Sequence, residues 1–222
     1  MQTDFQRREI AIKLVYYGPP HSGKTTNLQK LFERIDPHMR GRLLTLDTRD
    51  DRTLYFDLLP ILLRSQGGMT IKFKVYTVPG QALHHATRRL VLQGADGVAF
   101  IADSRISETR NNNLSFADLK SNLKENGIDP AAIPLVIQFN KRDLPGVRSE
   151  EEIEQLAQRG RQLMFRASAI QGEGVAETFL GLVQHTWDHL EARLQLEQRY
   201  GLSGQQLLGQ LRHQLLEAGR TS

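Results

Sequence analysis

Short apolar runs that predict strands alternate along the chain with stretches of helical periodicity. The first run, IAIKLVYY at 10–17, alternates imperfectly and ends at Gly18, which is typical of a strand covered on both faces. TLYFDLLP, near 53–60, predicts an edge strand that Pro60 closes. Further strand-like runs lie at 71–78, 97–103 and 134–140. Because helical patterns separate these runs, the order favours an α/β fold with a mostly parallel sheet flanked by helices.

The helical patterns begin at 26–35, where apolar residues recur at helical spacing. Similar patterns occupy 83–93, 112–126, 150–161 and 175–198. We expect them to cover the sheet and to complete one domain over residues 1–198, a length that can bury one core.

Residues 199–222 predict an amphipathic helical extension of that domain. Gly201 is typical of the residue just past a helix end, and Ser203 with Gln206 predicts a capping box for one more helix. An apolar stripe follows, formed by Leu207, Leu208, Leu211, Leu215 and Leu216. The stripe is expected to pack on its own domain, and the alternative is a surface that binds a partner helix.

A complete phosphate-binding motif, GPPHSGKT at 18–25, lies between the first predicted strand and the first predicted helix. Its glycines allow backbone N–H groups to surround phosphate oxygens, and the start of the helix adds partial positive charge. Lys24 is expected to reach the phosphates, and the Thr25 hydroxyl to bind Mg²⁺. The nucleotide-binding residues predicted here are Gly18, His21, Ser22, Gly23, Lys24, Thr25 and Thr26.

The motif NKRD, directly after the strand at 134–140, identifies the expected base. A carboxylate at Asp143 can accept hydrogen bonds from the ring N–H and the amino group of guanine, whereas adenine offers an acceptor at that ring nitrogen. Asn140 and Lys141 complete the motif, and a backbone N–H near Ser168 and Ala169 is placed to meet the guanine oxygen. Taken alone NKRD is typical of a solvated turn, but after a phosphate-binding loop it favours guanine.

Charge and composition exclude several other classes of protein. The net charge is +4, with 29 basic and 25 acidic residues mixed along the chain, so nucleic-acid binding is not expected. The chain has no cysteine, which excludes disulfides and cysteine-linked lipid anchors. It shows no signal peptide and no apolar stretch of membrane-spanning length, so we expect a cytoplasmic protein without an integral membrane segment.

The phosphate-binding loop, PGQ, NKRD and SA occur in the order and spacing of Ras-like GTPases. The stretches YYGPPHSGKTTNLQ, DRTLYFDLLP, YTVPGQ and QFNKRDLP closely resemble the MglA family of bacterial polarity and gliding-motility GTPases. The likeness covers about residues 8–190. The interior of the phosphate-binding loop differs in detail, and the tail beyond about 195 extends past the family pattern. The resemblance implies a Ras-like, P-loop NTPase fold.

The resemblance also assigns residues that the motifs alone do not. Gly80 contacts the nucleotide, Gln81 positions the attacking water, and Arg52, from the DRT pattern, supplies catalytic positive charge from within the chain. Thr53 joins Thr25 as a second ligand of Mg²⁺. Ras-like proteins usually carry an aspartate where this chain has Thr77, and the MglA family resembles this chain in having threonine there.

These features predict a GTPase switch that converts GTP to GDP and phosphate with Mg²⁺, slowly without a regulator. By resemblance, the regulator is a roadblock-type protein like MglB, and effectors recruit the chain to a cell pole or a motility complex. An alternative is a GTP-bound scaffold with little hydrolysis that works through protein contacts, which the neutral Thr77 motivates. A third class, a P-loop kinase, is disfavoured by NKRD. Arg88 and Arg89, on the predicted helix after Gln81, are expected to be solvated rather than catalytic.

Overall fold

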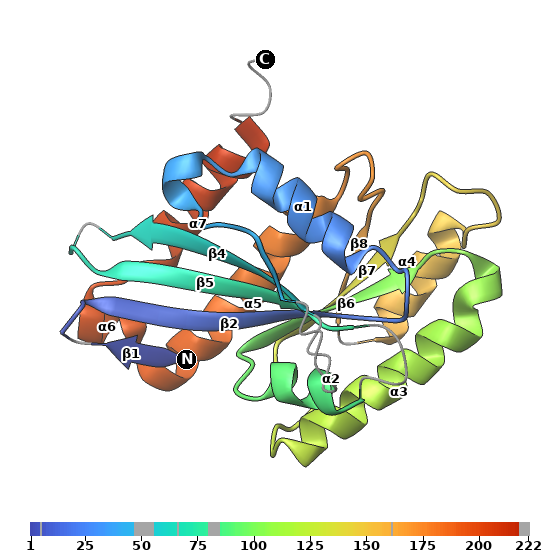
Figure 1. Cartoon of the computed structure of the whole chain (residues 1–222), viewed down its shortest axis with the longest axis horizontal. Helices are drawn as coiled ribbons and strands as arrows, with labels where there is room; N and C mark the ends of the chain where they lie inside the picture. Colours follow the sequence, from blue (N-terminus) through green and yellow to red (C-terminus); the bar gives the residue numbers. More distant parts are fainter. Residues whose placement is uncertain (5, 47–55, 66, 80–84, 161, 218–222) are drawn as a thin grey trace.

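The computed structural model describes residues 1–4, 6–46, 56–65, 67–79, 85–160 and 162–217 of the 222-residue chain. Within these residues an eight-stranded sheet lies at the centre of the fold (Figure 1). Its strands are β1 (Gln2–Asp4), β2 (Glu9–Tyr17), β3 (Leu44–Leu46), β4 (Phe56–Arg64), β5 (Thr70–Thr77), β6 (Gly97–Asp103), β7 (Leu135–Asn140) and β8 (Leu163–Arg166). The order is β3-β4-β5-β2-β6-β7-β8, with β1 antiparallel to the first half of β2. The strands β5, β2, β6, β7 and β8 are parallel, which confirms the predicted fold class.

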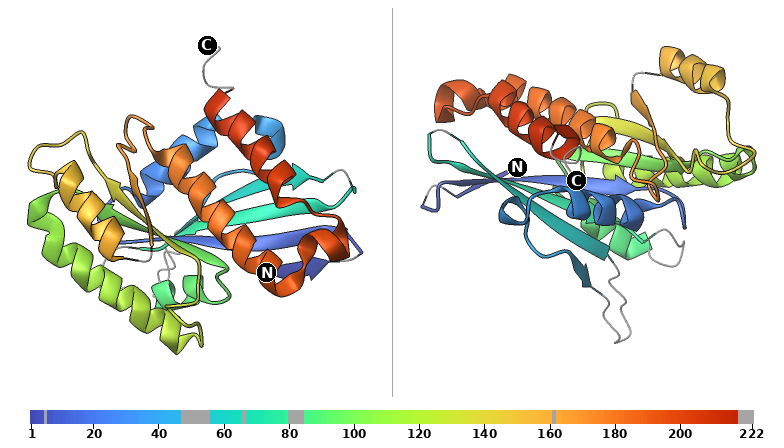
Figure 2. Two further views of the ribbon diagram at one scale, coloured as in Figure 1. Left: turned by 180° about the vertical axis from the view of Figure 1, so that it is seen from behind. Right: turned by 90° about the horizontal axis from the view of Figure 1, so that it is seen from above.

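Helices cover both faces of the sheet. They are α1 (Lys24–Arg34), α2 (His85–Leu92), α3 (Thr109–Glu125), α4 (Glu150–Arg159), α5 (Val175–Leu194), α6 (Leu196–Tyr200) and α7 (Gly204–Arg212), with 3₁₀ turns at Pro37–Met39 and Ile106–Glu108 and a π turn at His213–Glu217. One buried cluster joins the sheet to α1, α5 and α7, and a second joins it to α2, α3 and α4. Seen from behind, α5 and α7 lie side by side across one face (Figure 2).

The prediction that Pro60 closes its strand was wrong, because β4 continues through Pro60 to Arg64. The Pro60 carbonyl accepts a hydrogen bond from the Gly41 N–H at 2.9 Å. The backbone nitrogen and carbonyl of Pro60 therefore face away from β5. The pairing of β3 with β4 ends at Leu58, before Pro60. The missing proline N–H therefore costs no hydrogen bond of either ladder. The predicted edge position was also wrong, since β3 lies outside β4.

The predicted helix at 175–198 is interrupted at Gln195, whose backbone is left-handed with φ 53°. This residue separates α5 from the short helix α6. Gly201 ends α6 in the left-handed conformation, as predicted. Ser203 does precede α7, but its side chain makes no capping hydrogen bond, so the predicted capping box is absent there. A complete capping box is formed by Ser149 and Glu152 at the start of α4.

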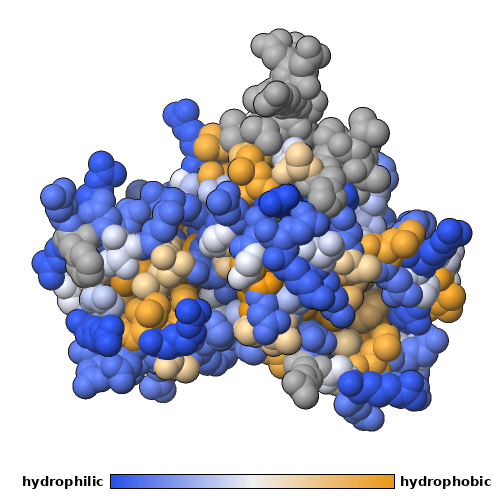
Figure 3. All heavy atoms as spheres, turned by 90° about the horizontal axis from the view of Figure 1, so that it is seen from below, coloured by the Kyte–Doolittle hydropathy of each residue, from blue (hydrophilic) through white to orange (hydrophobic). Residues whose placement is uncertain are grey.

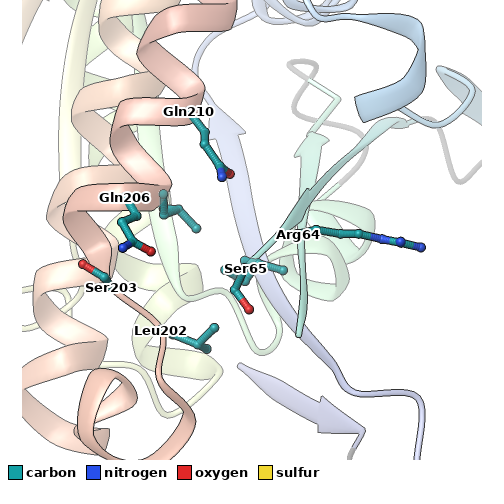
Figure 4. Close-up of a pocket in the computed structure, with 8 residues that line it drawn as sticks. Arg64, Ser65, Leu202, Ser203, Gln206 and Gln210 are labelled. Carbon is teal, nitrogen blue, oxygen red and sulfur yellow. The ribbon is translucent and has the colours of Figure 1, made fainter. Parts of the chain in front are cut away.

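The leucine stripe of the tail packs on the domain itself. Leu207, Leu208, Leu211 and Leu215 are buried, and the stripe's last residue, Leu216, is 36% exposed. Figure 4 shows the side of α7 that faces the end of β4, where Gln206 and Gln210 point across a narrow crevice lined also by Arg64 and Ser65. The own-domain alternative is confirmed for the buried leucines, and the division at 198/199 stays a prediction.

Replacing Leu211 with alanine is expected to lower the free energy of unfolding by about 2–5 kcal/mol, because its side chain is fully buried. Leu216→Ala, in the same stripe but partly exposed, should change it by less than about 1 kcal/mol. Thermal and urea unfolding of both variants measure the difference. Equal, small effects of the two substitutions would show that α7 does not hold to the domain in solution.

No helix in the described ranges is long and apolar enough to cross a membrane. On the face seen in Figure 3, apolar side chains form several separate patches among polar ones.

Candidate nucleotide-binding site

The phosphate-binding loop connects β2 to α1, and two of its glycines are required by close packing. Gly18 has φ 151°, and a Cβ there would lie 2.2 Å from the carbonyl oxygen of Ile101. Gly23 has φ 96°, and a Cβ there would lie 2.2 Å from the Nδ2 atom of Asn140. His21 is also left-handed, with φ 58°. The loop therefore curls tightly against β6 and against the NKRD motif.

A buried polar network anchors α1 below this loop. Asn27 and Gln138 exchange two hydrogen bonds between their side-chain amides, at 2.9 and 3.0 Å. Gln138 also donates to the Thr178 hydroxyl at 2.8 Å. Because these groups are buried and come from α1, β7 and α5, they fix the start of α1 relative to the sheet.

The start of α1 has the properties of an anion site. Among the described residues no side chain caps its N-terminus, and its first turn holds no acidic residue, so backbone N–H groups and the helix dipole are available to an anion. Lys24 is buried, and its ammonium donates to the carbonyls of Gly18 and Pro19 at 3.0 and 2.7 Å. The Ser22 hydroxyl is buried beside them without a partner in the described residues. A phosphate would supply the missing acceptor, so the residues present fit this group.

The electrostatics of Lys24 point the same way. Burial and the positive charge of Arg88 lower the pKa of its ammonium, the carboxylate of Asp57 acts in the opposite direction, and the net result is a pKa of about 7. A bound phosphate would add negative charge at this position and favour the protonated ammonium. Within the described residues, Lys24 is therefore a buried basic group whose ammonium forms no ion pair with a carboxylate.

Asn140 joins three of the predicted motifs. Its Nδ2 donates to the Ser22 carbonyl in the phosphate-binding loop at 2.7 Å, and its Oδ1 accepts from the Ala169 N–H at 2.9 Å. Ser168 donates its hydroxyl to the Asp143 carboxylate at 2.5 Å. The structure thus places the phosphate loop, NKRD and the SA turn within direct hydrogen-bonding contact.

Lys141 and Asp103 form a charged pair at the end of β6 and β7. Lys141 has a left-handed backbone with φ 66°, and its ammonium lies 2.8 Å from Asp103. Burial alone would raise the pKa of the Asp103 carboxyl, but hydrogen bonds from Arg105 and Lys141 outweigh it and lower that pKa to about 2. Asp103 therefore stays ionised and holds Lys141 against the sheet.

A carboxylate that the motifs did not identify lies beside Thr25. Asp57, on β4, is 1% exposed. Its Oδ2 accepts hydrogen bonds from the hydroxyls of Thr25 and Thr77 at 2.7 and 2.9 Å, and its Oδ1 accepts from Thr45 at 2.9 Å. The sequence did contain a signal, because Asp57 shares the buried face of its strand with the apolar residue Leu59.

The predicted residues Gly80, Gln81, Arg52 and Thr53 lie outside the described residues. Thr26, in the first turn of α1, is partly exposed. The predicted roles of Gly80, Gln81, Arg52 and Thr53 therefore stay predictions. The structure shows the residues on either side of the undescribed segment 47–55, which follows β3 and precedes β4.

The expectation that Arg88 and Arg89 are both solvated was wrong for Arg88. Its side chain is buried and pairs with Asp118, with Nε 3.4 Å from the carboxylate. The Tyr17 hydroxyl donates to the same carboxylate, so a charged network fastens α2 to α3 and β2. Arg89 is exposed and lies 3.3 Å from Glu125. The sequence pattern places both arginines on α2 but does not show which one faces α3.

Comparisons with known proteins agree with this site. Residues 1–186 match the model of the ADP-ribosylation factor (Arf) family. The mutual gliding-motility protein MglA of Myxococcus xanthus (strain DK1622) is 44% identical over 175 residues, which cover 79% of this chain and 90% of that protein. The chain belongs to the MglA family of small GTPases. The ADP-ribosylation factor-like protein 6 of Caenorhabditis elegans is 22% identical over 187 residues, covering 82% of this chain and 90% of its own.

Membership of this family explains why the binding motifs meet at the carboxyl ends of parallel strands. The helices α6 and α7 lie beyond residue 186, outside the stretch that matches the Arf family model. Both helices contact α5.

Proposed function

We propose that this chain hydrolyses GTP with Mg²⁺ and acts as a nucleotide-dependent switch. The observation that carries the proposal is the side chain of Asn140, which links the phosphate-binding loop to the Ala169 N–H of the SA turn. Because the two loops are directly linked, one nucleotide can place its phosphates on the first loop and its base on the second. Together with membership of a small GTPase family, this arrangement favours a guanine nucleotide.

The predicted site residues have distinct roles in this proposal. The Asp143 carboxylate, held by Ser168, accepts from guanine. Lys24 and the N–H groups of the phosphate-binding loop bind the phosphates, and Thr25 with Thr53 holds Mg²⁺. When bound, the ion neutralises phosphate charge and fixes the phosphates in position. Thr25 suits this role because its hydroxyl oxygen is a hard ligand that is already oriented by Asp57.

Hydrolysis is assigned to Gln81 and Arg52. Phosphoryl transfer depends on an oriented water and on positive charge near the developing phosphate oxygens. Gln81 is placed by its motif to orient the water, and Arg52 to supply the charge. We expect slow turnover in the isolated chain and faster turnover in the presence of a regulator of the roadblock type.

The biological setting follows from the relatives. The name of the Myxococcus relative attributes gliding motility to that protein. For this chain we infer a role in bacterial motility or polarity, with an MglB-like regulator, effectors that read the GTP state, and recruitment from the cytoplasm to a cell pole. The alternative of a GTP-bound scaffold is motivated by Thr77, a neutral residue where related GTPases carry aspartate.

Single-turnover hydrolysis tests the switch against the scaffold. The chain is loaded with GTP, Mg²⁺ is added, and GDP is quantified over time without a partner. We expect measurable turnover that Gln81→Leu lowers by at least about 10²-fold, because the water is no longer oriented. Gln158→Leu, an exposed change on α4, is the matched control and should keep the parent rate.

Two outcomes would contradict the proposal in different ways. GTP that stays bound and intact for hours, even with a roadblock-type regulator present, favours the scaffold. A preference for ATP over GTP would reject the guanine assignment and bring back the kinase hypothesis.

A further inference from the structure

The Mg²⁺ site of this family lacks a carboxylate at a position where other Ras-like proteins have one. Thr77, the last residue of β5, stands at that position, and its side chain is neutral. A hydroxyl can hydrogen-bond to a metal-bound water, but it does not balance the charge of the ion. The structure shows a carboxylate within hydrogen-bonding contact of this hydroxyl, on the adjacent strand.

Asp57 reaches this place through the pairing of β4 with β5. The two strands are antiparallel and their ladder ends with Leu58 opposite Tyr76, so Asp57 and Thr77 stand opposite each other one position beyond its last pair. Their side chains lie on the same buried face, and the Asp57 N–H donates to the Thr77 hydroxyl at 2.9 Å. A substitution of aspartate by threonine on one strand is thus matched by an aspartate directly across from it.

The surroundings of Asp57 are unusual for a structural carboxylate. It is 1% exposed, and burial of a charge is costly unless an opposite charge or several hydrogen bonds compensate for it. In the described part of the chain its carboxylate contacts are hydroxyl groups, from Thr25, Thr45 and Thr77. Its charge acts on the Lys24 ammonium, but no described basic side chain forms an ion pair with it. The site therefore holds a buried negative charge next to the threonine that is assigned to Mg²⁺.

We propose that Asp57 supplies, from β4, the carboxylate of the Mg²⁺ site that position 77 lacks. The inference rests on the proposed GTPase function. Thr25 binds the ion through its hydroxyl oxygen, and the same hydroxyl donates a hydrogen bond to Asp57 Oδ2, 2.7 Å away. Such an acceptor orients a ligand and makes its oxygen a better donor to the metal. Asp57 is a positioning residue, and its carboxylate keeps contacts with Thr25 and Thr45 that do not involve Thr77.

The proposal gives β4 a function beyond its place in the sheet. Asp57 and Thr45 stand on the strands that flank segment 47–55, and both are tied to Thr25 through one carboxylate. The carboxylate thus links the start of α1 to both of these strands.

The test measures how Mg²⁺ controls release of a fluorescent GDP analogue, which requires no hydrolysis. The concentration of Mg²⁺ that gives half of its full effect on the release rate is compared between the parent and Asp57→Asn. We expect that concentration to rise about 10–100-fold in the variant. Release in EDTA should change less than threefold. An unchanged half-effect concentration in Asp57→Asn overturns the proposal.

A second variant separates Asp57 from its neighbour and does not depend on the folding of the first. Thr77→Val removes the hydroxyl and keeps the carboxylate, so its half-effect concentration should stay within about threefold of the parent. A tenfold or larger rise in Thr77→Val would show that the threonine itself serves the ion and overturns the proposal. If the parent releases GDP at the same rate with and without Mg²⁺, the proposed GTPase function fails instead, which separates the two conclusions.

Discussion

Replacement of Asp143 with asparagine is expected to lower the affinity for GDP by about 10²–10³-fold, because two hydrogen bonds from guanine to a charged acceptor are lost. Asparagine presents an N–H₂ group where the carboxylate presented an oxygen. The guanine amino group would then face another donor, whereas xanthine has a carbonyl at that position. We therefore expect the affinity for XDP to rise as that for GDP falls. Competition of GDP, XDP and ADP against a fluorescent nucleotide measures all three affinities.

The structure supplies a control and a graded companion for this experiment. Asp188→Asn makes the same chemical change at an exposed position on α5 and should leave all affinities unchanged. Ser168→Ala removes the hydroxyl that holds the Asp143 carboxylate at 2.5 Å, so it should cost about tenfold in GDP affinity without a gain for XDP. Equal affinity of the parent for GDP and ADP would reject the assignment of NKRD to guanine.

The sequence alone predicted the fold class because its signals are local. Apolar runs alternate with helical patterns, and one glycine-rich loop follows the first run. Each of these signals can be recognised from residues that are neighbours in sequence. The positions that were predicted wrongly depend on partners elsewhere in the chain. Pro60 is compatible with a strand because its carbonyl faces Gly41, and Arg88 is buried because α2 lies against Asp118 of α3. Neither contact is visible in a window of sequence.

The same reasoning applies to the site. The residues of the phosphate-binding loop and of NKRD could be named because their spacing is fixed by the ligand that they surround. Asp57 could not be named in this way, since its partner Thr77 is twenty positions further along the chain, and only the register of β4 and β5 brings them together. A charged residue at a buried position of an otherwise apolar strand was the available signal. Such a residue has to be explained by its partners.

Replacement of Arg52 with alanine is expected to slow single-turnover hydrolysis of bound GTP by about 10³–10⁵-fold, while GTP affinity stays within a few-fold. An arginine acts on charge that develops as the phosphate is transferred, so its removal raises the barrier more than it weakens binding. The measurement is the conversion of preloaded GTP to GDP, followed for several days for the variant, together with GTP dissociation to show that the nucleotide remains bound.

Arg49→Ala is the matched control, because both arginines lie in the segment that β3 precedes and β4 follows. The DRT pattern, which resembles that of the MglA family, favours Arg52 over Arg49. A loss of rate in Arg49→Ala alone would move the role to Arg49. Parent rates in both variants would show that neither arginine acts in hydrolysis, and that the charge must come from a partner.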